Sequence, residues 1–286
     1  MPVFLLQAFT PSGEREDFLW VHDQEQRKAW RVKPDQAAHE RDYYRVDIPE
    51  VDPNIVETTF AETIETRAAA LVREMGRTHE LPHGEDLQAL IEFVALLALR
   101  TPSFRAMYER NMEHMHRHFA KTLLSRREPF DRFIEEQRQQ GVEIPPEITY
   151  EGMRDFAFDD ERYTVEISRT NSVQMLLKMW QGIVPVFLAR QWSLLFTKPD
   201  EGHLFCSDMP VSITPTSPDF QPRFLGFGLP QIELTVPLSR SMALVGSYEA
   251  PSISAEISLD YARHLNRRTL SFAERFLYSS EKGLLI

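Results

Sequence analysis

The sequence has a single cysteine, Cys206, in 286 residues. One thiol cannot form a disulfide within the chain, and it excludes zinc sites built from several cysteines. Such sparse use of cysteine is typical of a reducing compartment, so we expect a cytoplasmic location. Because Cys206 lies in a short apolar run, we interpret it as an inert core residue and not as an activated nucleophile.

Uninterrupted apolar runs are also missing. The longest apolar stretch, 175–196, contains Lys178, Gln181, Arg190 and Gln191. Charged groups are costly inside a bilayer, so this stretch is predicted to be a core segment and not a membrane span. The first residues lack the basic region and the apolar run of a signal peptide. We therefore expect a soluble protein.

Positive charge is in deficit. Lysine and arginine number 32 against 43 aspartates and glutamates, which gives a formal net charge of -11. A chain this acidic is not expected to hold nucleic acid or an anionic membrane non-specifically, although a local basic face could exist. The hydrophobic content of 42% and the charged content of 26% are ordinary for a folded globular protein.

Several common catalytic signatures do not occur. No glycine-rich loop with lysine and serine or threonine is present, and the glycines of 226–230 lack the third glycine of a dinucleotide fingerprint. The absence of a Gly-x-Ser-x-Gly elbow disfavours a standard serine hydrolase. No lysine follows an acid at a distance of two residues, so the usual motif of metal-dependent restriction-type nucleases is absent too.

Strand patterns stand at both ends of the chain. Apolar residues bounded by turn residues predict an amino-terminal strand that starts at 4–6 and is ended by 11–13, and two more at 18–21 and 29–32. The same signals predict carboxy-terminal strands at 192–196, 204–206, 211–213, 232–236, 242–245 and 276–279, with a helix at about 258–273 before the last one.

The middle of the chain has helical periodicity. Asp52 and Pro53 suit a helix start and Gly76 suits its end. A second helix, at about 85–100, is apolar nearly all round and must be buried. Further helices are expected from 102 towards 125, at 129–140 and at 172–190.

Strands at both ends around a helical middle predict an α+β fold. We expect one domain over residues 1–286, in which the amino- and carboxy-terminal strands form an antiparallel or mixed sheet. A helical subdomain of about 52–190 would be inserted between the strand regions 2–33 and 191–279.

A histidine pair stands out in the predicted third helix. His114 and His118 lie four residues apart and share a helix face, whereas His116 points away. Two imidazoles at this spacing can bind zinc, but a third ligand and a catalytic acid would be needed for metal chemistry. The alternative is a solvated basic face of a surface helix.

Asp208 is the best-placed candidate for chemistry. It follows one short apolar run and precedes another, and Pro210 stiffens the connection between them. A carboxylate at such a strand end can act on a ligand, or it can simply cap a turn. The residues alone leave both interpretations open.

Further acids, Glu40, Glu57 and Glu65, also lie next to apolar or turn residues instead of on charge-rich faces. If the fold gathers them with Asp208, burial and mutual repulsion would raise some of their pKa values, as catalytic or metal-binding acids require. The alternative is that each caps a helix, completes a turn or pairs with a neighbour such as Arg100.

The chain resembles the DUF4238 family, a domain of unknown function, over nearly its whole length. The motifs that carry the resemblance are Pro2-x-Phe4-Leu5-Leu6-x-x-Phe9, Leu19-Trp20-Val21, Trp30, Glu40-x-Asp42-Tyr43-Tyr44, Glu57, Glu65, Arg100-Thr101-Pro102, Asn171, Trp192, Ser207-Asp208-x-Pro210, Pro237-Leu238 and Asn266. The resemblance implies the architecture and no particular reaction.

Two positions depart from the family pattern. The family usually has a histidine three residues before the proline that Pro2 matches, a position before Met1. The start is therefore truncated or that histidine is dispensable. Between Asp208 and Pro210 the family often has asparagine, and Met209 stands there.

Our first hypothesis is a recessed site that binds a phosphate-containing ligand or nucleic acid. Asp208, Glu65, Glu57 and Arg100 are its candidate catalytic residues, and Glu40, Asn171, Trp192 and Asn266 its candidate binding residues. A divalent metal held by the carboxylates would support hydrolysis, with Arg100 stabilising phosphate charge.

The second hypothesis is a non-catalytic module that binds a small molecule, nucleic acid or protein. In that case the same residues form a structural ion-pair network.

Overall fold

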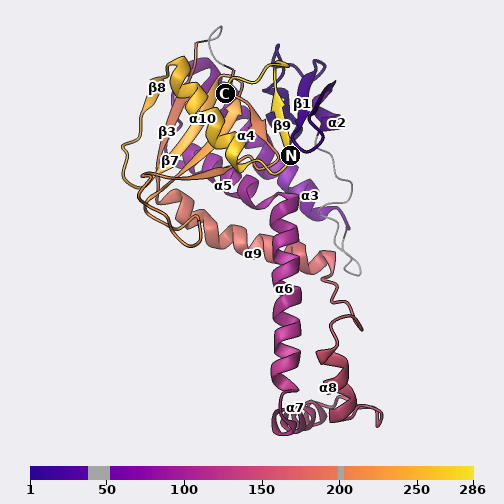
Figure 1. Ribbon diagram of the computed structural model, residues 1–286. Helices are drawn as coiled ribbons and strands as arrows, with labels where there is room; N and C mark the ends of the chain where they lie inside the picture. Colours follow the sequence, from indigo (N-terminus) through magenta and orange to yellow (C-terminus); the bar gives the residue numbers. More distant parts are fainter. Residues whose placement is uncertain (38–51, 199–202) are drawn as a thin grey trace. The chain divides into compact units, whose positions relative to one another are not determined.

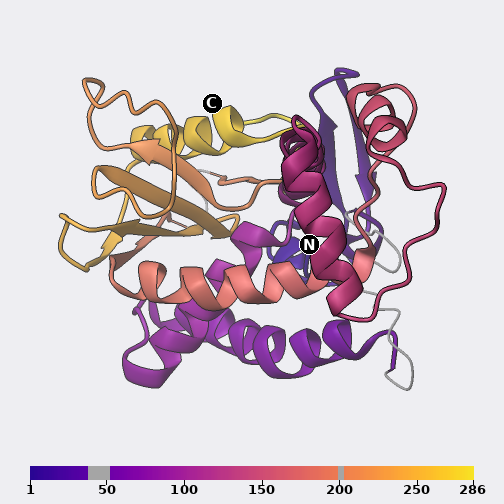
Figure 2. The same cartoon turned by 90° about the horizontal axis from the view of Figure 1, so that it is seen from below.

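The computed structural model describes residues 1–37, 52–198 and 203–286 (Figure 1, and turned by 90° in Figure 2). The chain forms two compact units. The core unit comprises residues 1–103 and 173–286, and the helical unit comprises residues 104–172. The single domain with a helical subdomain of about 52–190 stays a prediction.

The α+β class is confirmed, and the described strands form antiparallel and mixed sheets in the core unit. The first sheet is antiparallel and has the order β2-β1-β9-β4. Its strands are β1 (Leu19–Asp23), β2 (Lys28–Val32), β4 (Cys206–Ser207) and β9 (Phe276–Ser279). The expected meeting of amino- and carboxy-terminal strands therefore occurs where β1 pairs with β9.

The second sheet is mixed and has the order β5-β6-β7-β3-β8, in which only β3 and β8 run parallel. Its strands are β3 (Gln191–Phe196), β5 (Ser212–Pro215), β6 (Ile232–Ser239), β7 (Met242–Ser247) and β8 (Ser254–Glu256). Trp192 of β3 lies against Gly246 of β7, where a Cβ would come within 2.8 Å of the indole ring. Gly246 is therefore needed for this close packing.

The predicted strand that starts at 4–6 is wrong. Residues Val3–Gln7 form the helix α1, which buries the successive residues Leu5 and Leu6. A strand with one buried face would instead bury alternate residues. An apolar run this short does not distinguish the two by periodicity.

The helix predicted from Asp52 to Gly76 is interrupted by a wider turn. The segment consists of α3 (Ile55–Thr59), the π-helical η1 (Phe60–Glu65) and α4 (Thr66–Thr78). The helix passes Gly76 and ends where His79 adopts a left-handed φ of 57°. A helix end at Gly76 is expected because glycine adopts left-handed φ angles most easily, but here the left-handed residue after the helix is His79.

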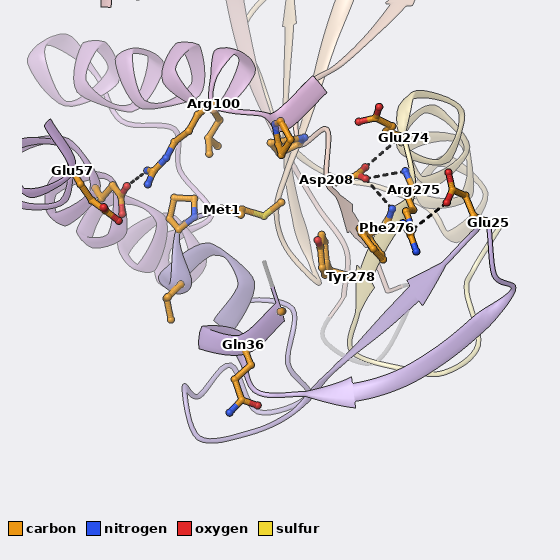
Figure 3. A pocket seen from close by; sticks show the side chains of 17 residues that line it. Met1, Glu25, Gln36, Glu57, Arg100, Asp208, Glu274, Arg275, Phe276 and Tyr278 are labelled. Carbon is orange, nitrogen blue, oxygen red and sulfur yellow. Dashed lines mark hydrogen bonds and ion pairs between the residues drawn. The ribbon is translucent and has the colours of Figure 1, made fainter. Parts of the chain in front are cut away.

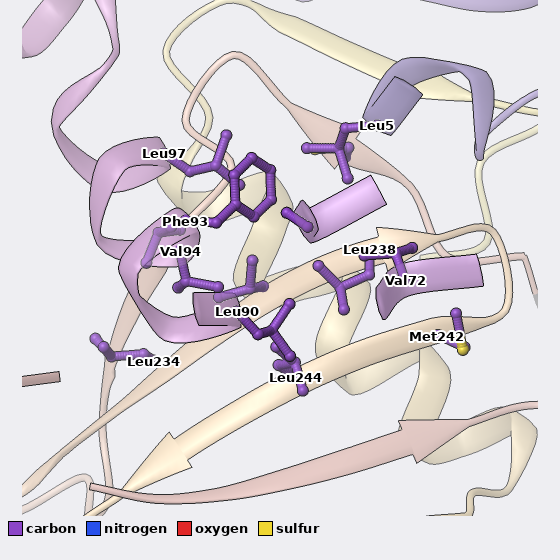
Figure 4. Close-up of a cluster of buried hydrophobic side chains, with 14 of the residues drawn as sticks. Leu5, Val72, Leu90, Phe93, Val94, Leu97, Leu234, Leu238, Met242 and Leu244 are labelled. Atoms are coloured by element: carbon purple, nitrogen blue, oxygen red, sulfur yellow. The ribbon is translucent and has the colours of Figure 1, made fainter. Parts of the chain in front are cut away.

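The predicted buried helix is α5 (Gly84–Leu99), and it packs against the mixed sheet. Its apolar side chains meet those of β6 and β7 in the main hydrophobic core (Figure 4). The contacting residues include Leu90, Phe93, Val94 and Leu97 of α5 and Leu234, Leu238, Met242 and Leu244 of the strands.

The remaining helices of the core unit are the short α2 (Pro34–Ala37) and α10 (Leu259–Phe272), together with most of α9 (Arg169–Leu188). Ser258 caps α10 by accepting from the backbone N–H of Tyr261 at 3.3 Å. A serine at this position satisfies one of the free amides of the first turn. The cap thereby fixes where α10 begins before the chain returns to the sheet as β9.

The helical unit contains most of α6 (Pro102–Leu123), with α7 (Arg127–Gln139) and α8 (Tyr150–Phe158) at its carboxy-terminal end (Figure 1). Leu124, Phe130 and Ala157 form a small core. Among the helices described, no single one is long and apolar enough to cross a membrane, and only the bent pair of α5 and α6 passes that test jointly.

Candidate functional site

A pocket of about 670 Å³ opens in the core unit, bordered by segments far apart in sequence. Figure 3 shows Glu57 and Arg100 at one side and Asp208, Glu274 and Arg275 at the other. The lining includes the carboxylates of Glu25, Glu57, Glu65, Asp208 and Glu274, the guanidinium groups of Arg100 and Arg275, and apolar side chains from Pro2, Val3, Leu97, Pro210 and Phe276. Its size is that of a small-molecule site.

The Asp208 carboxylate accepts hydrogen bonds from the protein backbone. Its Oδ1 accepts from the backbone N–H of Glu274 at 3.0 Å, and its Oδ2 accepts from those of Arg275 and Phe276 at 2.8 and 2.9 Å. In return, the Asp208 N–H donates to the Phe276 carbonyl at 3.0 Å. The side chain therefore fixes the connection between α10 and β9. This is the turn-capping role that the sequence left open beside a role in ligand chemistry.

Arg275 is held by two acids of the β1–β2 hairpin, Asp23 at the end of β1 and Glu25 in the turn. Its Nη2 and Nε donate to Asp23 Oδ2 at 2.7 and 3.1 Å, and its Nε lies 3.4 Å from Glu25 Oε2. The hydrogen bond from Arg275 lowers the pKa of Asp23 below its usual range. This interaction joins the hairpin to the start of β9 and engages Nε and Nη2 of Arg275.

Glu65 and Arg100 form an ion pair on the opposite side of the pocket. Only 16% of the Glu65 side chain and 12% of the Arg100 side chain are exposed. Two charges at such depth need each other, because removing either one leaves the other poorly solvated. Glu65 comes from the end of η1 and Arg100 from the residue that follows α5, so the pair ties the two helical segments together.

Glu57 and Glu274 differ from the acids already discussed. Both are exposed, and among the described residues neither carboxylate has a hydrogen bond or ion pair. Glu25 is exposed as well, with Arg275 as its partner. The pocket therefore presents unengaged negative charge at its rim, while its deeper charged groups are already neutralised by internal partners.

Cys206 and Tyr278 are paired on the neighbouring strands β4 and β9, and Tyr278 lines the pocket. Both are buried, and burial raises the pKa of the Cys206 thiol to about 12. Burial also raises the pKa of Tyr278 well above its ordinary value. Neither group is ionised near neutral pH, so neither supplies a nucleophile, in agreement with the prediction of an inert cysteine.

Two of the candidate binding residues, Trp192 and Asn266, have internal partners away from the pocket lining. Trp192 is buried and donates from Nε1 to the Phe187 carbonyl at 2.9 Å. Asn266 is buried and bonds backbone groups of His203, Phe205 and Leu285. Neither lines the pocket.

Two further candidates remain. Asn171 is exposed in the first turn of α9 and belongs to the helical unit. Glu40 lies outside the described residues. Binding roles for all four candidates stay predictions.

Metal ligation has no visible support in the described parts of the chain. Within residues 1–37, 52–198 and 203–286, no three histidine, cysteine, aspartate or glutamate side chains come together to hold an ion. Asp208 and Glu65 both face the pocket, yet their oxygens serve backbone amides and Arg100, respectively.

Three charged lining residues were not among the sequence candidates. Glu25 lies in the polar turn between two predicted strands, and Glu274 and Arg275 directly precede the last one. Each looks like an ordinary surface charge in the sequence. Only the pairing of β1 with β9 brings Glu25 close to Glu274 and Arg275.

A family model described as "Protein of unknown function (DUF4238)" matches residues 1–283. No curated protein and no solved structure matches the chain.

Proposed function

The chain belongs to the DUF4238 family of proteins of unknown function, and from its pocket we propose a non-catalytic binding module for a small cationic ligand. The ligand class is an organic amine or guanidinium compound with a short apolar part. The proposal corresponds to the second hypothesis from the sequence, in which the polar residues are largely structural.

The observation that carries the proposal is how the charges around the pocket are distributed. Asp208 is occupied by three amides and Glu65 by Arg100, whereas the carboxylates of Glu57 and Glu274 are exposed and without partners in the described residues. Unengaged carboxylates accept hydrogen bonds from a cationic nitrogen, and such charge-assisted bonds are stronger than neutral ones. The apolar lining from Val3, Leu97 and Pro210 suits the carbon skeleton of such a ligand.

The first hypothesis, a phosphate-containing ligand or nucleic acid with metal-dependent hydrolysis, has less support. Arg275 is engaged by Asp23 and Glu25, and Arg100 by Glu65. An incoming phosphate would compete with these carboxylates and would face the exposed glutamates of the rim. The small number of unengaged cationic donors favours a cation over an anion.

The proposed setting is a reducing cytoplasm. Cys206 is buried and its thiol stays protonated near neutral pH. An acidic chain with a net charge of -11 also attracts small cations by its overall field.

Calorimetric titration with agmatine, spermidine, inorganic phosphate and magnesium chloride tests the proposal. We expect heat of binding with at least one of the amines, weakened by added salt, and no saturable heat with phosphate in the presence or absence of magnesium. Saturable phosphate binding together with no response to either amine would overturn the proposal.

Two charge-matched variants locate the binding. Glu57→Gln removes one rim charge, and Glu249→Gln removes the same charge from an exposed residue that does not line the pocket. We expect the Kd for the amine to rise by roughly tenfold for E57Q, in line with one charge-assisted hydrogen bond of about 1.4 kcal/mol. E249Q should leave it unchanged, and equal effects of both variants would show that only net charge matters.

A further inference from the structure

Tyr278 lines the pocket from a position that the sheet holds rigidly. It belongs to β9, which lies between β1 and β4 and pairs with both at this residue. Alternate residues of a strand lie on the same face of the sheet, so Phe276 and Tyr278 both line the pocket while Leu277 lies on the other face. Pairing on both sides fixes the backbone of Tyr278 and therefore the place of its ring.

The hydroxyl of Tyr278 is not used by the fold. Only 2% of the residue is exposed, and in the described ranges of the chain the hydroxyl has no hydrogen-bond partner. Figure 3 shows the hydroxyl oxygen pointing into the pocket, toward the space between Met1 and Asp208. Polar groups buried this deeply normally have a partner. A molecule in the pocket can provide one.

The phenol is a neutral hydrogen-bond donor. Burial and the negative charge of Asp208 raise the pKa of Tyr278 above its ordinary value of 10, so the O–H group keeps its proton at neutral pH. The unengaged carboxylates of Glu57 and Glu274, in contrast, can only accept hydrogen bonds. The pocket therefore offers acceptors at its rim and a donor at Tyr278.

We propose that Tyr278 selects amines that also carry a neutral oxygen, such as an alcohol or an amide carbonyl. The inference rests on the proposed function, since the rim carboxylates would hold the ammonium group while the Tyr278 O–H donates to the oxygen. A ligand without such an oxygen would cover the O–H group and leave it unsatisfied, which weakens binding.

The surrounding charges favour a neutral oxygen over an anionic one. Asp208 lies close enough to Tyr278 to raise its pKa, and the rim adds further unengaged carboxylates. The guanidinium groups of Arg100 and Arg275 are already paired with acids. A carboxylate of the ligand would therefore be repelled beside Tyr278, so an amino alcohol or an amino amide fits better than an amino acid.

Matched ligands test the selection by calorimetric titration. 5-Aminopentan-1-ol and hexylamine differ only in a hydroxyl against a methyl group, and 3-aminopropan-1-ol and butylamine repeat the comparison with a shorter chain. We expect the alcohol to bind at least roughly tenfold more tightly than the alkylamine in one of these pairs. Equal affinities within both pairs would overturn the proposal.

A second comparison addresses the charge of the oxygen. 6-Aminohexanamide and 6-aminohexanoate have the same chain and end in a neutral amide and a carboxylate, respectively. We expect the amide to bind more tightly than the carboxylate. Tighter binding of 6-aminohexanoate would overturn the preference for a neutral oxygen.

Tyr278→Phe removes only the hydroxyl. The variant should lose the preference for the alcohol over the alkylamine, and it should bind agmatine no less tightly than the wild type, because agmatine has no oxygen. Since the hydroxyl has no partner in the described fold, Y278F should be at least as stable to urea as the wild type without ligand. A preference that persists in Y278F, or a clear loss of stability, would overturn the proposal.

Tyr248→Phe is the matched control. The Tyr248 hydroxyl donates to the Val186 carbonyl at 3.1 Å, and the residue does not line the pocket. Y248F should be less stable than the wild type and should keep the preference for the alcohol. If Y248F lost that preference as well, Tyr278 would not be the selecting residue.

The inference and the proposed function fail in different ways. Binding of agmatine or spermidine without any preference for the alcohols would leave the cation site standing and overturn the role of Tyr278. Absence of binding by every amine would overturn both.

Discussion

The Asp208 carboxylate accepts the backbone N–H of Arg275 at 2.8 Å, although the two residues are 67 positions apart. The same Arg275 reaches with its side chain to Asp23 in the first hairpin. Asp208 therefore fixes the main chain of Arg275, and Arg275 in turn fixes the edge of the pocket. Asp208, the strongest candidate for chemistry in the sequence, therefore helps to hold the structure of the pocket.

Replacing Asp208 by alanine is predicted to destabilise the protein by about 2 kcal/mol, since three backbone N–H groups lose a charged acceptor. Urea unfolding followed by circular dichroism measures this change. Glu274→Gln alters a neighbouring acid without removing those bonds and should leave the free energy of unfolding nearly unchanged. A D208A variant as stable as the wild type would refute this structural role.

Replacing Glu65 by glutamine is predicted to lower the free energy of unfolding by about 2 kcal/mol, because a charge-assisted hydrogen bond to Arg100 at low exposure is lost. Glu62→Gln, on the same π-helical segment but exposed, is the matched control. Thermal and urea unfolding of the two variants give the comparison. Equal stability of E65Q and E62Q would mean that the ion pair contributes nothing.

Stability is predicted to fall as the pH is lowered from about 7.5 to about 5.5. Burial lowers the pKa of His22 below its ordinary value of 6.5, so the unfolded chain binds a proton more readily than the folded one. The contribution is complete above the unfolded pKa and is lost as the pH falls through the folded pKa. Urea unfolding at both pH values should show a smaller loss for His22→Asn than for the wild type.

His264 is the comparison for that experiment. Its pKa is also lowered, first by burial and then by the nearby charge of Arg268. His264→Asn should remove a separate part of the pH dependence, so the double variant should be less pH-dependent than either single one. A wild-type stability that does not change over this range would contradict both assignments.

Cys206 is predicted to resist thiol reagents in the folded protein. The residue is buried, and burial raises its pKa to about 12, so access and ionisation are both unfavourable. Reaction with Ellman's reagent at pH 8 should be negligible until urea unfolds the chain, and one thiol per chain should then react. Rapid labelling without denaturant would show that β4 opens readily.

Much of the architecture could be predicted from local patterns. The burial of α5 follows from apolar residues on all its sides, and the β1–β2 hairpin follows from two short strands around a polar turn. The helix at Val3–Gln7 could not be predicted in the same way, because an apolar run this short fits either period. The π-helical turn at Phe60–Glu65 has no local sequence signal that we recognise.

The site was predictable in part. Glu57, Glu65, Arg100 and Asp208 were candidates from the sequence, and all four line one pocket. The partners of Asp208 were not predictable, because backbone amides carry no residue signature and these lie 66 to 68 positions further along. Glu274 and Arg275 were missed for the same reason, since only the pairing of distant strands gives them a place at the pocket.

The most direct test of the binding function is a crystal structure of the protein soaked with agmatine. We predict one ligand in the pocket, with a cationic nitrogen within hydrogen-bond distance of Glu57 or Glu274 and the Glu65–Arg100 pair intact. An empty pocket at a concentration that saturates the calorimetric signal, or agmatine bound elsewhere, would contradict the account.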